Sequence, residues 1–131
     1  MLKYSIFIIL ITLLSCIENK ETPVVLNKKL LIEFQHFEGC PNSSKLLENL
    51  KESIKGLEDK VEIKEILVST PELAKKCNFR GSPTILVDGN DLLDMPIPDQ
   101  PSLSCRIYPN GLPSSEFIRA YLNSKIEKKL N

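Results

Sequence analysis

Cys40 stands at a position where a thiol becomes reactive. An apolar stretch ends at Phe37, and an amphipathic helix is expected to begin at Cys40 or Pro41. The free N–H groups and the positive dipole end of a helix favour thiolate over thiol, and the thiolate is both the nucleophile and the ligand for soft metals. The residue three positions on is Ser43, so Cys40 cannot close a disulfide within this motif.

Two other cysteines outside the leader have weaker signals. Cys77 shares a predicted helix face with Leu73, so we expect it to be a small buried apolar side chain. For Cys105 two interpretations stay open, a strand interior or a position beside Cys40. Outside the cytoplasm, any single pairing among these three cysteines leaves one thiol over.

His36 and Arg80 are the candidate cations for Cys40. His36 lies four residues upstream, which is about 13 Å of extended chain, so a partly buried strand histidine is the favoured interpretation. Arg80 is able to lower the pKa of Cys40 or to hold an anionic substrate, and the simpler interpretation is a solvated arginine.

The first fifteen residues predict export. Lys3 and the apolar run from Ile6 to Leu14 are typical of a signal peptide and are short for a membrane span. The sequence Leu-Leu-Ser-Cys at 13–16 resembles a bacterial lipobox, which implies cleavage before Cys16 and a lipid on that residue. We therefore expect a signal peptide over 1–15, a lipidated Cys16 with a polar tether over 16–27, and an envelope domain on the extracytoplasmic or periplasmic side of the membrane. The alternative is an uncleaved anchor or an ordinary signal peptide.

Composition limits the remaining possibilities. The chain has 17 basic and 17 acidic side chains in 131 residues, so no electrostatic case for nucleic-acid binding exists. About a hundred residues remain after the tether, enough for one small core over 28–131. Four aspartates, Asp88, Asp91, Asp94 and Asp99, lack the spacing of a calcium loop and are expected to be turn residues and solvated charge. We predict no metal site and no cofactor.

The apolar pattern alternates between strands and helices. Pro83 opens an apolar strand that Asp88 and Gly89 close, and the proline-rich stretch 91–101 is expected to be irregular. Further strands are expected at 29–37, 61–68 and 102–108, and helices from Cys40 or Pro41 to about Gly56, at 71–76 and at 115–128.

This order resembles the thioredoxin fold, an α/β architecture with a four- to five-stranded mixed sheet flanked by helices. Residues 40–43, Cys-Pro-Asn-Ser, stand where that superfamily has Cys-x-x-Cys or Cys-x-x-Ser, and Gly-Ser-Pro-Thr at 81–84 stands where it has its cis-proline. The resemblance implies a catalytic Cys40 with Ser43 in the second cysteine's place. It also implies a cis Ser82-Pro83 bond, with the backbone of Ser82 pairing with extended substrates.

The chain departs from the thioredoxin pattern at several points. Ser43 removes the internal route by which thioredoxins release a mixed disulfide. Phe34 stands where thioredoxins commonly have a buried acid, and Gly39 stands where they have a tryptophan. The sequence Ser-Cys-Arg at 104–106 is absent from ordinary thioredoxins. Together these features resemble a group of small bacterial thioredoxin-like proteins, some of them labelled alkylmercury-lyase-like. Such lyases grip mercury with two thiolates, a role this resemblance opens to Cys40 and Cys105.

Our hypothesis from the sequence is a membrane-tethered thiol protein in which Cys40 forms mixed disulfides with a partner protein or a small thiol. Cys105, Cys77 or an external thiol would resolve them. The rival is a non-catalytic or lyase-like binder that holds a thiophilic metal or an organomercurial with Cys40 and Cys105. A third possibility is a scaffold without thiol chemistry.

Overall fold

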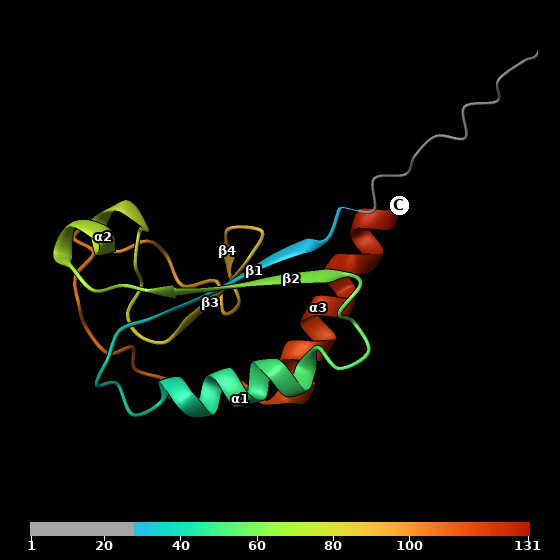
Figure 1. Ribbon diagram of the computed structural model, residues 1–131, viewed down its shortest axis with the longest axis horizontal. Helices are drawn as coiled ribbons and strands as arrows, with labels where there is room; N and C mark the ends of the chain where they lie inside the picture. The colour runs from blue at the N-terminus through green and yellow to red at the C-terminus, as the bar shows by residue number, and fades with distance from the viewer. Residues whose placement is uncertain (1–27) are drawn as a thin grey trace, which may run out of the picture.

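The computed structural model describes residues 28–131 (Figure 1). The predicted signal peptide, the lipidated Cys16 and the tether lie outside these residues. Within 28–131, every helix is too short or too polar to cross a bilayer.

Four strands form one mixed sheet. Their order is β2-β1-β3-β4, with β1 parallel to β2 and antiparallel to β3, and β3 antiparallel to β4. The bounds are β1 Leu30–His36, β2 Val61–Leu67, β3 Thr84–Val87 and β4 Asn90–Asp91. This is the predicted α/β architecture, with the central strand β1 leading directly to Cys40.

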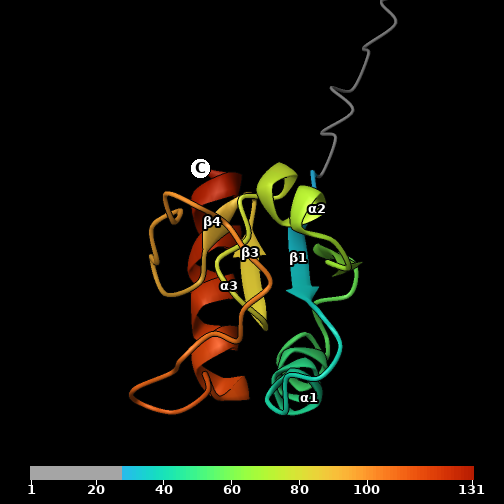
Figure 2. The ribbon, with the colours of Figure 1, turned by 90° about the vertical axis from the view of Figure 1, so that its left-hand side faces the viewer.

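Three helices flank the sheet. They are α1 Ser43–Ser53, α2 Pro71–Lys76 and α3 Ser115–Leu130. α1 and α3 lie together on one face and α2 on the other, as the two ribbon views show (Figures 1 and 2). Thr70 and Ser114 cap α2 and α3, because their hydroxyls accept hydrogen bonds from the amides of Leu73 and Phe117.

The larger apolar core lies between the sheet and helices α1 and α3. Alternate residues of β1 point into it, and the fully buried Phe34 packs in the same cluster as Leu46 of α1 and Ile118 of α3. Burying each such side chain stabilises the fold by roughly 1.5 to 3 kcal/mol. A smaller cluster of Val68, Ala74 and Phe79 packs beneath α2. Core packing thus fixes both elements that flank Cys40.

The structure corrects three boundaries. α1 begins at Ser43, because Pro41 and Asn42 form a turn closed by the amide of Ser43 on the carbonyl of Cys40. β4 lies at the start of the stretch predicted to be irregular. The stretch 102–108 is not a strand, since its pairing is a single bridge at Cys105 and Arg106 turns inward to a buried partner.

Candidate functional site

Cys40 lies in the turn between β1 and α1 and is only 6% exposed. Asn42, at the N-cap of α1, makes no side-chain capping bond, and the first turn of α1 contains no acidic residue. The positive end of α1 is therefore not neutralised by its own side chains, and such an end favours the thiolate form of a nearby cysteine.

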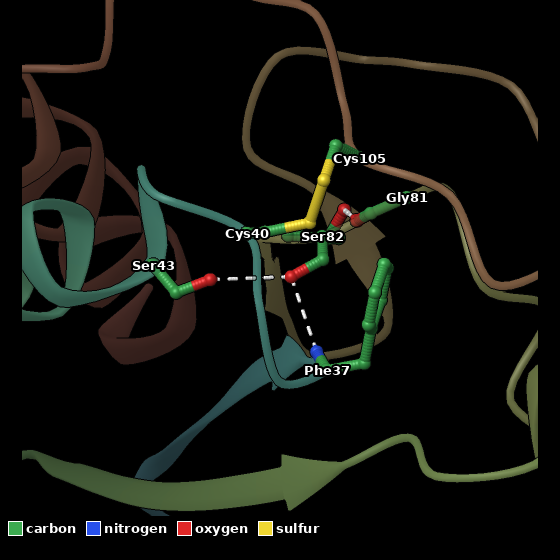
Figure 3. Close-up of a disulfide and its surroundings, with 7 residues drawn as sticks. Phe37, Cys40, Ser43, Gly81, Ser82 and Cys105 are labelled. Atoms are coloured by element: carbon green, nitrogen blue, oxygen red, sulfur yellow. Dashed lines mark hydrogen bonds between the residues drawn. A yellow bond between two sulfur atoms is a disulfide. The ribbon is translucent and has the colours of Figure 1, made fainter.

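Cys105 forms a disulfide with Cys40 (Figure 3). The two α-carbons lie 5.8 Å apart across 65 residues of sequence. This separation falls within the usual range of about 4.4 to 6.8 Å. Of the two interpretations of Cys105, the structure shows the position beside Cys40. Cys105 is exposed whereas Cys40 is buried, so the two ends of the bond differ in accessibility.

Ser82 holds the segment that carries Cys105. The Ser82-Pro83 bond is cis, as predicted. The amide of Ser82 donates to the carbonyl of Ser104 at 2.8 Å, and its carbonyl accepts from the amide of Arg106 at 2.8 Å. The backbone that the thioredoxin resemblance assigns to an extended substrate is therefore occupied by this chain's own segment 104–106.

Ser43 takes part in a polar contact beneath the disulfide. Its hydroxyl lies 3.2 Å from the hydroxyl oxygen of Ser82, which also accepts from the amide of Phe37 at 3.1 Å (Figure 3). This contact ties the end of β1, the start of α1 and the cis-proline loop together around the site.

A buried ion pair anchors the residue that follows Cys105. The guanidinium of Arg106 donates to both carboxylate oxygens of Asp91, at 2.7 and 3.0 Å, and to the hydroxyl of Thr84 at 3.2 Å. The side chains of Arg106 and Asp91 are 4% and 1% exposed. Burial alone would raise the pKa of Asp91, but hydrogen bonds from Arg106 and from the amides of Met95 and Leu93 outweigh it and lower that pKa.

The prediction that Asp91 is solvated was therefore wrong, and the anchoring pair of Arg106 and Asp91 was not predicted from the sequence. The only local signal is a charged residue directly after Cys105 in an otherwise apolar and polar-neutral stretch. Tyr108 was missed too. It lies under the guanidinium of Arg106, 5.0 Å from ring centre to Cζ, and its hydroxyl donates to the carbonyl of Pro83. Burial raises the pKa of Tyr108 to about 12, so it remains a neutral donor.

The Nε of Arg80 donates to the carbonyl of Met95 at 2.9 Å. Arg80 lines a pocket on the α2 side of the sheet together with Cys77 and Glu33. Cys77 is a half-buried free thiol, and burial, with the Glu33 carboxylate adding to it, raises its pKa. The structure thus brings Cys40, Ser43, Ser82, Pro83 and Cys105 together, and it groups Arg80 with Cys77 instead.

A pocket of about 450 Å³ opens beside Cys40. Among the side chains that line it are His36, Phe37, Glu38 and Glu65. The Nε2 atom of His36 lies 3.0 Å from the Glu65 carboxylate, which fits the strand-histidine interpretation. Two carboxylates make this side of Cys40 acidic.

Comparisons with known proteins bear on the fold. No protein-family profile matches the chain, and no curated protein matches its sequence. The crystal structure of chloroplastic thioredoxin z superimposes with a TM-score of 0.51 at 20% identity, covering 76% of this chain and 80% of that one. A malarial protein of known structure superimposes with a TM-score of 0.50 at 12% identity, covering 74% and 97%. The fold is therefore thioredoxin-like.

Proposed function

We propose that this protein is a thiol–disulfide exchange protein of the cell envelope, with Cys40 and Cys105 as its redox pair. One observation carries the proposal: the two sulfurs are bonded to each other beside the cis Ser82-Pro83 bond of a thioredoxin-like fold. One sulfur of the pair accepts the partner's sulfur, and the other then resolves the mixed disulfide.

The setting of the disulfide supports exchange over a purely structural role. The segment around Cys105 is held not only by the disulfide but also by the Arg106–Asp91 pair and by both backbone hydrogen bonds of Ser82. Opening the bond therefore leaves both sulfurs close to each other. Intramolecular proximity of this kind makes re-formation of the bond fast.

The alternative form of this function is a monothiol route, in which Cys40 acts without a second cysteine of the same chain. Ser43 stands where a second cysteine would resolve the intermediate, and its hydroxyl bonds to Ser82 instead. Cys105 supplies the missing thiol from another part of the chain, which favours the two-cysteine route.

The membrane tether is proposed from the sequence of residues 1–27. If Cys16 carries a lipid, a Cys16→Ser protein expressed in its native host should leave the membrane fraction and incorporate no labelled fatty acid. Retention in the membrane with unchanged labelling would contradict the tether and would leave the exchange chemistry unaffected.

The exchange itself is tested by turnover. Catalytic amounts of the protein should accelerate the reduction of a fluorescent disulfide peptide by dithiothreitol. Cys40→Ser and Cys105→Ser should each lower this acceleration by about tenfold or more, because each removes one step of the exchange. Cys77→Ser is the matched control and should retain the full rate. Equal rates for all four proteins would contradict the proposal.

A thiophilic-metal binder is the competing function. Two sulfurs that bond each other lie close together when reduced, and paired thiolates suit soft metals. Within residues 28–131, no group of three or more histidine, cysteine or acidic side chains is arranged to hold a metal. Stoichiometric mercury uptake that both serine variants abolish, together with no turnover on the peptide, would favour this competitor.

A further inference from the structure

The two residues joined by the Cys40–Cys105 disulfide differ in their exposure to solvent. Cys40 is 6% exposed, whereas Cys105 is an exposed residue. An incoming thiolate must reach the sulfur it attacks from the side opposite the bond that breaks, so access decides between the two. On access alone, Cys105 is the better target.

The charges around the two sulfurs favour the same choice. The pocket beside Cys40 carries the carboxylates of Glu38 and Glu65, which repel an approaching thiolate. His36 offsets this only when it is protonated, through its contact with Glu65. On the other side, Arg106 next to Cys105 is neutralised by Asp91, so no net negative charge from this pair opposes the approach.

The leaving group also favours attack on Cys105. A sulfur of lower pKa leaves faster, and Cys40 precedes a helix whose first turn has no acidic residue and no side-chain cap. Cys105 has no comparable helix end, because it lies in a single-residue bridge to Ser82.

We infer that a partner thiolate attacks the Sγ of Cys105 and that Cys40 departs, an order that rests on the proposed exchange function. The new bond joins the partner sulfur to Cys105, while the Cys40–Cys105 bond breaks and its electron pair stays on the Cys40 sulfur. A second thiolate of a dithiol partner then attacks the partner's own sulfur, and Cys105 leaves as a thiolate. The partner dithiol is oxidised to a disulfide and the protein disulfide is reduced, so two electrons are transferred.

The contacts of the segment that carries Cys105 hold the Cys105 sulfur in place next to Cys40. The buried Arg106 side chain forms an ion pair with Asp91, and Ser82 forms backbone hydrogen bonds with the residues on both sides of Cys105. The mixed disulfide therefore forms on a segment that stays in place, and the Cys40 thiolate lies close to it. A partner with a single thiol is expelled by Cys40, whereas a partner with two thiols completes the exchange.

The test is a rapid-quench experiment on the oxidised full chain. The protein is mixed with 2-mercaptoethanol, a neutral monothiol, and stopped with acid within the first tenth of the reaction. Freed thiols are labelled with N-ethylmaleimide at mildly acidic pH, and peptide mapping reads every cysteine separately, including Cys16 and Cys77.

We expect mercaptoethanol on Cys105 and maleimide on Cys40 in at least about tenfold excess over the reverse pattern. An equal share, or an excess of mercaptoethanol on Cys40, would overturn the order of attack and leave the exchange function standing. An intact disulfide after prolonged treatment of the folded protein with excess dithiothreitol, a dithiol, would overturn the exchange function and this order with it.

Discussion

Cys40 and Cys105 are held next to each other by different kinds of contact. Cys40 lies between two regular elements, β1 and α1, whose side chains pack in the main core. Cys105 lies in an irregular segment that is held by the buried Arg106–Asp91 pair and by hydrogen bonds to Ser82. Apolar packing thus positions Cys40, and polar contacts position Cys105. Substitutions of the polar contacts should therefore affect the Cys105 segment and leave the packing around Cys40 in place.

Removing the guanidinium should have the largest effect. Arg106→Ala leaves the buried Asp91 carboxylate unpaired, and breaking a buried pair in this way costs about 3 to 5 kcal/mol. Urea unfolding measures the loss. Lys129→Ala is the matched control, because its pair with Asp88 is partly exposed and should contribute less than about 1 kcal/mol. Equal losses in the two variants would contradict the anchoring role of Arg106.

Opening the disulfide should have the next largest effect. A disulfide typically stabilises a folded protein by about 2 to 4 kcal/mol. Reduced wild-type protein should therefore unfold at lower urea, yet still cooperatively, because Arg106 and Ser82 retain the segment. Cys105→Ser should unfold at the same urea concentration with and without reductant. Loss of cooperative unfolding on reduction would show that the polar contacts do not suffice.

A methyl group at Gly81 should disturb the approach of the Cys105 segment. Gly81 has φ +97°, and a Cβ there would meet backbone and side-chain atoms of Arg106 at 3.1 Å. Gly89 has a similar φ of +82° with nothing within 4 Å, so Gly89→Ala carries only the conformational cost of about 1 to 2 kcal/mol. Gly81→Ala should lose more stability than Gly89→Ala and should form the disulfide more slowly in air oxidation. Equal behaviour of the two alanine variants would argue against the close approach.

The smallest effect is expected from pH. Because the pKa of Asp91 is lowered in the folded protein, its contribution to stability is fully present above the unfolded pKa near 3.8. The contribution is lost as the pH falls through the folded pKa, with a slope of at most about 1.4 kcal/mol per pH unit for one proton. Urea unfolding of the wild type between pH 5 and 2 should show a steeper decline than Asp91→Asn. Parallel curves would exclude Asp91 as the titrating group.

The regular half of the site could be predicted from the sequence and the irregular half could not. Apolar periodicity identified β1, α1 and α3, and the resemblance of residues 81–84 to the cis-proline motif of thioredoxins implied the cis bond. The partnership of Arg106 with Asp91 joins two residues 15 positions apart through tertiary geometry, and no periodic pattern reports such a contact. For the same reason, spacing alone left the position of Cys105 open, and only the fold places its sulfur on Cys40.

The most direct test of the central claim is a redox titration of the folded protein. The full chain is equilibrated in dithiothreitol buffers of increasing reducing strength, and the linked Cys40–Cys105 peptide is quantified by mass spectrometry while circular dichroism reports the fold. We predict one two-electron transition with the dichroism signal unchanged throughout. A disulfide that opens only when the protein unfolds, or a chain in which Cys40 and Cys105 are never linked, would contradict the account.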